Sequence, residues 1–224
     1  MDPNHKLWNA QQQELQRALE HPLNHQEAIG LFLAHHAMTH SAKISPSKLW
    51  SYEDEVLDGL TEADIRRIPE KEEHSIAWIL WHLARIEDVT MNLLVAGSPQ
   101  IFSTGNWLTK MGFNSKDTGN ALDKAGIVLL SKVIDIDALR AYRISVGQRT
   151  HAIVKALQPG AFKLKVDPVC LEKVLTEGAV AESTRWLIEY WGKKTIAGLL
   201  LMPPTRHNFV HLNESAQLKK KLNS

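Results

Sequence analysis

The most apolar helix that the sequence predicts lies in the stretch SIAWILWHLARIEDVTMNLLVAG, residues 75–97. Ser75 is a residue type that caps free amide groups at a helix N-terminus, and Gly97 followed by Pro99 is typical of a helix end. Twenty helical residues span on the order of 30 Å, which is the length of a bundle helix. Isoleucine and leucine side chains form one face, and His82 lies beside that face. We therefore expect a long apolar helix that carries a histidine, uncharged unless it has a partner.

Further helices are predicted on both sides of this stretch, because apolar residues recur there at intervals of three and four. They cover about 24–42, 49–60, 135–157, 182–201 and 207–218, and short helices are expected at 121–131 and 171–175 inside long connections. No internal repeat and no alternating strand pattern of useful length is present. The prediction is one all-α domain over residues 1–224, with a peripheral N-terminal segment at 1–22 and a helical bundle at 24–218.

Charge and cysteine content exclude several classes of protein. Lys and Arg total 26 and Asp and Glu total 25, so the net charge of +1 favours neither nucleic acid nor an anionic membrane as a partner. No apolar run approaches the length of a membrane span. Cys170 is the single cysteine, which excludes an intrachain disulfide and a multi-cysteine metal site. We expect a cytoplasmic protein.

A second stretch, PPTRHNFVHLNE at residues 203–214, carries the chemistry. His207 and His211 are four residues apart, so on a helix their imidazoles lie one turn apart and can converge on one metal ion. The two prolines suit the first turn of a helix. Glu214 projects from the same face as both histidines. The alternative is that the two histidines are hydrogen-bonded core or surface residues near a helix end.

The same spacing of four recurs elsewhere in the chain. His21 and His25 are separated by Pro22, which is typical of a linker. The pair His36 and His40 lies on a predicted helix, but the sequence offers no evident third ligand for it. Spacing alone therefore does not select the metal site.

The two histidine-bearing stretches, taken in their order along the chain, resemble those of a known protein family. Residues 75–88, followed much later by 195–214, resemble the DinB-like superfamily, which includes YfiT-type metalloproteins, metal-dependent hydrolases and bacterial thiol transferases. The similarity runs from about residue 55 to 216. It implies a four-helix up-down-down-up bundle, here with an extra N-terminal helix and long connections, and typically a homodimer. It also implies a divalent metal on three histidines, which map onto His82, His207 and His211.

Three neutral imidazoles suit Zn²⁺ or Ni²⁺ and leave a coordination position for water or substrate. Glu214 is expected either to orient a histidine or to act as a base. Trp78 and Trp107 are expected to line a pocket, Trp107 from the long connection at 97–134. Relatives that build ergothioneine carry His-x-x-x-His-x-Glu, whereas Asn213 stands at that last position here, which argues against oxygen-dependent iron chemistry.

The function expected from this resemblance is that of a metal-dependent enzyme. It would activate a low-molecular-weight thiol, as an S-transferase, or water, as a hydrolase, against a small-molecule substrate. The alternative is a non-catalytic, stress-associated dimeric helical bundle whose metal site is structural or vacant. Neither nucleic acid nor a membrane is expected as a partner.

Overall fold

The computed structural model describes residues 2–21, 24–46 and 49–222, and the chain is helical throughout these ranges apart from turns and connections. No strand is formed by the described residues; Lys165 and Thr195 make an isolated antiparallel bridge. The prediction of an all-α protein is therefore confirmed. The helical elements are α1 (Pro3–Glu20), α2 (His25–Ala37), η2 (Ala42–Ile44), α3 (Tyr52–Leu57), α4 (Glu62–Arg66), α5 (Ile76–Asp88), η3 (Val89–Val95), α6 (Ile101–Thr104), α7 (Trp107–Met111), α8 (Lys124–Val133), α9 (Ile136–Ala156), η4 (Ala161–Lys163), α10 (Pro168–Thr176), η5 (Glu182–Thr184), α11 (Trp186–Gly192), α12 (Ile196–Leu201), η6 (Met202–His207) and α13 (Asn208–Leu222).

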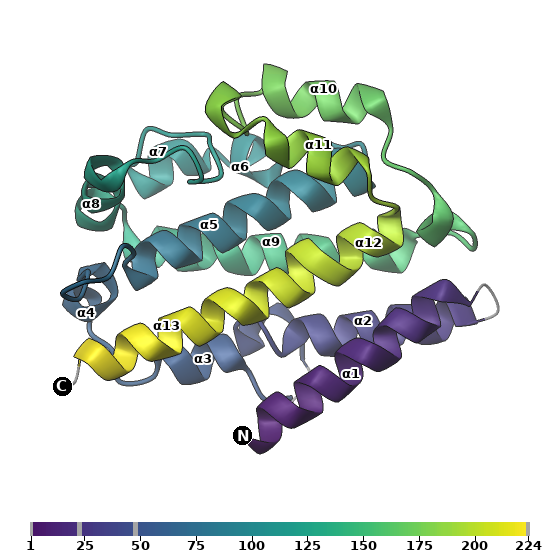
Figure 1. Ribbon diagram of the computed structural model, residues 1–224, viewed down its shortest axis with the longest axis horizontal. Coiled ribbons are helices and arrows are strands. Elements are labelled where there is room, and N and C mark those ends of the chain that lie inside the picture. Colours follow the sequence, from purple (N-terminus) through teal and green to yellow (C-terminus); the bar gives the residue numbers. More distant parts are fainter. Residues whose placement is uncertain (1, 22–23, 47–48, 223–224) are drawn as a thin grey trace.

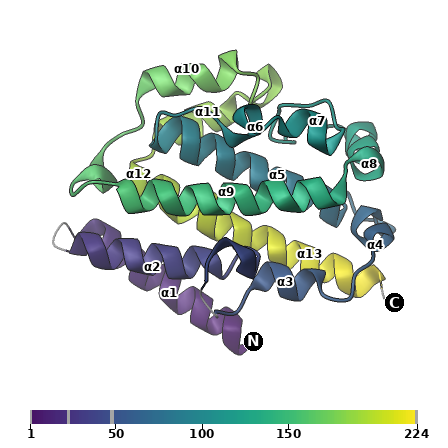
Figure 2. The same cartoon turned by 180° about the vertical axis from the view of Figure 1, so that it is seen from behind.

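Helix α5 lies at the centre of the molecule (Figures 1 and 2), and each of its residues is buried. Its start follows the prediction, because the Ser75 hydroxyl accepts a hydrogen bond from the Trp78 amide at 3.0 Å. The helix continues through the π-helical turns of η3 to Gly97, whose φ of 61° is the left-handed conformation that ends a helix. Burial on all sides explains why this stretch is the most apolar in the chain.

The other long helices pack around α5. Helix α9 packs against α5 on one side and contacts α2, while α13 contacts α5 from the other side. In Figure 1 the continuous α12–α13 helix runs alongside α5, and α9 lies behind. Asp135 caps α9 by accepting a hydrogen bond from the Ala138 amide at 2.8 Å. This arrangement brings residues near position 82 next to residues near position 207.

The prolines at 203 and 204 do not start a helix, which corrects the sequence-based prediction. They lie in η6, a π-helical segment that joins α12 directly to α13. Prolines have no amide hydrogen to donate, and a wider π-helical turn accommodates that break in the α-helical hydrogen-bond ladder. Thr205 makes no cap; its hydroxyl instead donates to the Leu200 carbonyl at 3.0 Å. His207 and His211 therefore sit within one uninterrupted helix.

The N-terminal helix α1 packs along α2 and α12 at one side of the molecule (Figure 1). It is more than a peripheral addition, because Trp8 is fully buried in the main hydrophobic core. The Trp8 ring stacks on Phe209 with 3.9 Å between ring centroids. Pro22, the residue expected to separate His21 from His25, lies outside the described residues.

The long connections contain short helices. The helix expected at 121–131 is α8, and the one expected at 171–175 is α10, which begins earlier because Asp167 caps it. Helix α10 packs on η3 and on α11. In the described part of the chain, no helix combines the length and the apolar character needed to cross a membrane.

Candidate metal centre

His82 enters the site from α5 with its orientation held from behind. Its Nδ1 lies 2.8 Å from the Thr118 carbonyl oxygen, which can only accept, so Nδ1 carries the hydrogen. The unprotonated Nε2 then faces α12–α13 and lies 3.0 Å from Nε2 of His207. A histidine whose second ring nitrogen is bound to a carbonyl in this way is prepared as a metal ligand.

A glycine allows the loop to approach His82 this closely. Gly119 follows Thr118 and has φ of 92°, a conformation that side chains with a Cβ rarely adopt. A Cβ at Gly119 would also lie 3.3 Å from ring atoms of Trp78 and Trp81. Both the backbone conformation and the packing therefore favour glycine at position 119, next to the Thr118 carbonyl.

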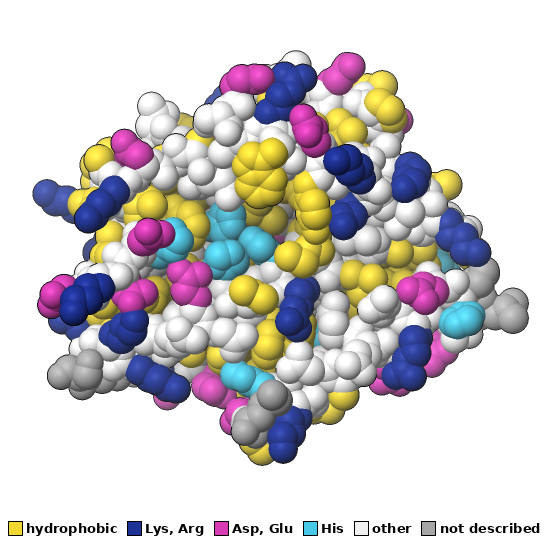
Figure 3. Space-filling model, in the orientation of Figure 1, with side chains coloured by type: hydrophobic (Ala, Val, Ile, Leu, Met, Phe, Trp, Pro, Cys, Tyr) yellow, Lys and Arg dark blue, Asp and Glu magenta, His cyan; other side chains and the backbone are white. Residues whose placement is uncertain are grey.

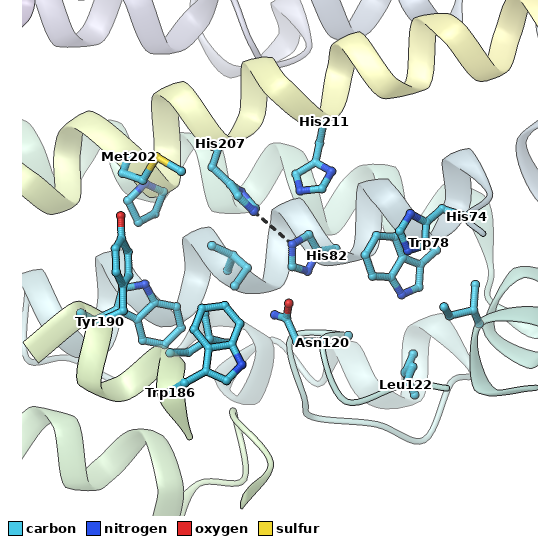
Figure 4. Close-up of a pocket in the computed structure, with 16 residues that line it drawn as sticks. His74, Trp78, His82, Asn120, Leu122, Trp186, Tyr190, Met202, His207 and His211 are labelled. Carbon is cyan, nitrogen blue, oxygen red and sulfur yellow. Dashed lines mark hydrogen bonds between the residues drawn. The ribbon is translucent and has the colours of Figure 1, made fainter. Parts of the chain in front are cut away.

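His207 and His211 complete the group from successive turns of one helix. Their ring centroids are 4.6 Å apart, and those of His82 and His211 are 5.0 Å apart. One ring nitrogen from each of the three residues lies within 4.8 Å of the others. Figure 4 shows the three rings pointing toward one another.

Burial keeps the imidazoles of His82 and His207 uncharged at neutral pH. Burial, with a smaller contribution from nearby His211, lowers the pKa of His82 to about 3. Burial and the two neighbouring imidazoles hold the pKa of His207 well below its usual value. Neutral imidazoles present lone pairs rather than protons, which is the state in which histidine binds metal.

The donor set fits a divalent ion. The Nδ1 atom of His207 has no hydrogen-bond partner, so this ring can carry its hydrogen there and leave Nε2 free for coordination. His82 and His211 both have Nδ1 bound to an oxygen and Nε2 available. Three imidazole Nε2 atoms that converge in this way match the ligand type and number of Zn²⁺ sites with an open position.

Glu214 binds two histidines at once. Its Oε2 accepts from Nδ1 of His211 and its Oε1 from Nδ1 of His74, each at 2.8 Å. Burial alone would raise the pKa of Glu214, but the hydrogen bonds from the two imidazoles lower it to about 2. His74 is therefore part of the site, and its ring also stacks on Trp78 with 3.8 Å between centroids. The sequence contains no local signal for this contact, because His74 and Glu214 are 140 residues apart.

A cavity of about 630 Å³ opens above the three histidines. Figure 3 shows histidine side chains gathered at the floor of a hollow, with hydrophobic side chains around it. Trp78 lines this cavity, as expected. The expectation for Trp107 has to be corrected: it is not among the lining residues, and its ring packs against Tyr142 with 5.5 Å between centroids.

Several wall residues were not predicted. Trp186 and Tyr190 reach the cavity from α11, and Asn120 reaches it from the loop after Thr118 (Figure 4). Trp186 is 57% exposed although it is a large apolar side chain. The exposure of Trp186 is known from the structure alone, so the sequence offered no signal for this wall.

The pair His36 and His40 also has a partner that the sequence did not reveal. Both rings contact the carboxylate of Glu87, and all three side chains are buried. This group shares no residue with the three-histidine site.

The protein is thus an all-helical protein with a three-histidine site at the floor of a pocket. Residues 47–213, most of the chain, match the family model described as the DinB superfamily. The chain belongs to the DinB superfamily, as the resemblance implied. A comparison with curated proteins finds no match.

Proposed function

We propose that this member of the DinB superfamily is a metal-dependent enzyme that holds zinc or nickel on His82, His207 and His211. It acts on a small-molecule substrate and uses water or a low-molecular-weight thiol as the nucleophile. The observation that carries this proposal is that the three imidazoles converge at the floor of a cavity large enough for a small molecule.

The number of ligands supports a catalytic rather than a closed structural site. The site contains three histidines. Among the described residues, no cysteine or carboxylate lies close enough to act as a fourth ligand. Closed zinc sites use four protein ligands, whereas catalytic sites use three. A divalent ion bound there would supply Lewis acidity, which lowers the pKa of a bound water or thiol toward neutrality.

The role of Glu214 is to orient His211. Each carboxylate oxygen accepts a hydrogen bond, one from His211 and one from His74, and these bonds lower the pKa of Glu214 to about 2, which makes it a weak base. The contact with His211 keeps the hydrogen of that ring on Nδ1 and directs Nε2 into the site. Of the two roles expected from the sequence, orientation of a histidine has the better support.

The cavity walls indicate the class of substrate. Trp78, Trp186, Tyr190 and Trp191 line it, and no Lys or Arg is among its lining residues. Aromatic walls favour a substrate with an apolar or aromatic part. The lack of cationic side chains favours water, or an uncharged thiol, over a thiol that carries several carboxylates. Asn120 is available to hydrogen-bond a polar group of the substrate.

The proposal includes the bundle arrangement that the resemblance implied. We assign α2, α5, α9 and α12–α13 as the four helices of an up-down-down-up bundle, with α1 as the extra N-terminal helix. The contacts of α5 with α9, of α13 with α5 and of α2 with α9 support this assignment.

Elemental analysis of the dialysed, untagged protein tests the site. The unsubstituted protein should contain one more zinc or nickel ion per chain than His82→Ala, while both have the same helical content by circular dichroism. Equal metal content in the two proteins would contradict the proposal. A metal-loaded protein should then be screened with aryl esters and amides in water, and with thiols plus aromatic electrophiles, with His82→Ala as the inactive control.

A further inference from the structure

We propose that His36, His40 and Glu87 form a second divalent-cation site, buried in the core and independent of the three-histidine site. This proposal goes beyond the function proposed above, because the two groups share no residue. The buried site could bind an ion whether or not the three-histidine site is catalytic.

The donor atoms already face one another. Nε2 of His36 lies 2.8 Å from Oε1 of Glu87, and Nε2 of His40 lies 2.8 Å from Oε2 of the same carboxylate. The ring centroids of the two histidines are 4.3 Å apart. Two imidazole nitrogens and two carboxylate oxygens thus surround one point, and both ligand types bind Zn²⁺.

The charge of Glu87 calls for a cation, which is either a proton shared with His36 or His40 or a bound metal ion. Its side chain is fully buried, and its other contacts are the Thr150 hydroxyl at 2.7 Å and the Asn208 amide at 2.9 Å, both neutral. Among the described residues no Lys or Arg hydrogen-bonds this carboxylate, and the buried guanidinium of Arg143 is paired with Glu53 instead. A buried anion without a cationic partner is costly. A divalent ion between Glu87 and the two imidazoles would supply the missing charge.

A neighbouring histidine connects this group to a cavity. The ring of His151 lies 5.0 Å from that of His36 between centroids, and its Nε2 is buried without a partner. His151 also lines a second cavity of about 650 Å³, together with Leu33 from α2 and Gln148 from α9. His151 therefore lies between the buried group and a cavity other than the one above the three histidines.

The enclosed position indicates a structural ion. Glu87 belongs to α5, His36 to α2 and His40 to the turn that follows α2, and Asn208, which donates to Glu87, begins α13. An ion at this point would join α2 and the turn after it to α5, beside the start of α13. Since the three groups are fully buried, we expect it to exchange slowly with solvent.

The test counts zinc ions in proteins that lack one site at a time. The double variant His207→Ala/His211→Ala removes two ligands of the three-histidine site and leaves the buried group intact. The substitution Glu87→Gln removes the charge of the buried group while preserving the shape of the side chain. All proteins are produced with added zinc, dialysed, checked for helical content and analysed for zinc. We expect the double variant to retain one zinc ion per chain, and the double variant with Glu87→Gln added to retain none.

A folded double variant without zinc would overturn the proposal and assign the charge opposite Glu87 to a protonated histidine. This outcome does not depend on whether Glu87→Gln folds, because the double variant keeps the buried group intact. The result is also separable from the function proposed above. If the three-histidine site held no metal, the unsubstituted protein and the double variant would contain the same single zinc ion.

Discussion

The Nε2 atoms of His82 and His207 lie 3.0 Å apart, although 125 residues separate them in the chain. The contact is possible because α5 carries His82 on the side that faces α12–α13, and because the Thr118 carbonyl turns its ring toward that helix. It defines the floor of the pocket, and the properties of the site depend on the groups that hold these rings in place.

Glu214→Gln should weaken metal binding without removing it. The neutral amide no longer favours the present orientation of His211 as strongly, and loss of such a partner typically costs 10–100-fold in metal affinity. Competition with a chromophoric zinc chelator measures the change. Glu62→Gln is the matched control, because Glu62 lies on the surface and its ion-pair partner among the described residues is Arg66 alone. An affinity for Glu214→Gln equal to that of the control would show that Glu214 does not orient His211.

Gly119→Ala should both destabilise the protein and weaken metal binding. The left-handed backbone at Gly119 costs about 1–3 kcal/mol for other residues, and the added Cβ presses on Trp78. The displaced loop moves the Thr118 carbonyl away from His82. Urea denaturation and zinc competition measure the two effects.

Gly30→Ala is the control for this substitution. Gly30 lies inside α2 with no atom within 4 Å of an added Cβ, so alanine should stabilise the protein by about 0.5–1 kcal/mol and leave zinc affinity unchanged. If both glycines behaved alike, the special position of Gly119 would be refuted.

Trp186→Ala should lower the affinity of the pocket for an apolar ligand about tenfold, with metal content unchanged. The side chain is 57% exposed, so its loss should change the free energy of unfolding by less than about 0.5 kcal/mol. Fluorescence titration with the neutral dye Nile red reports binding. Leu164→Ala, at a residue that is 61% exposed and outside the pocket, should leave dye binding as it is. Undiminished dye binding by Trp186→Ala would remove α11 from the pocket wall.

Trp8→Ala should destabilise the protein by about 3–5 kcal/mol, because it opens a cavity where α1 meets the core. Leu7→Ala, at the adjacent residue, which is 50% exposed, should cost less than about 0.5 kcal/mol. Urea denaturation followed by far-ultraviolet circular dichroism compares them. A small effect at Trp8 would mean that α1 is a detachable addition to the bundle.

Titration of Tyr52 should lower the stability of the protein at high pH. Burial raises the pKa of its hydroxyl to about 12 from an ordinary value of 10.0, with smaller contributions from Glu55 and Asp2. The folded state favours the neutral form, so this stabilisation is complete below pH 10 and is lost as the pH rises from 10 to 12. Tyr52→Phe also removes the hydrogen bond to Asn213, which costs about 1 kcal/mol at neutral pH.

The stability difference between the unsubstituted protein and Tyr52→Phe should therefore shrink between pH 10 and 12. Urea denaturation across this range measures it, and the comparison cancels the titration of groups that both proteins share. A constant difference would mean that the pKa of Tyr52 is the same in the folded and unfolded states.

Local patterns predicted the parts of this protein that depend on local physics. Ser75 caps α5 as expected, because capping is a contact within one turn. Helical periodicity gave the all-α class, since burial of one face requires that spacing. The two histidine-bearing stretches placed the chain in the DinB superfamily, which the family match over residues 47–213 confirms.

Other features could not be obtained from local patterns. A sequence rule favours a helix start at Pro203 and Pro204. The chain instead continues through them as a π-helix, because the joined α12–α13 helix packs on α5. The position of Trp107 depends on how a long connection folds, and aromatic residues in a connection do not reveal which cavity they face. These predictions failed because the deciding contacts lie far away in the chain.

By itself the sequence determined that the chain forms helices, where the central helix α5 begins, and which residues carry imidazoles at metal-ligand spacing. Only the tertiary structure decided which of these groups meet. It joined His74 to Glu214 and placed Glu87 between His36 and His40. The physical reason is that capping and periodicity act within a few residues, whereas the convergence of side chains on one point depends on the packing of helices from distant parts of the chain.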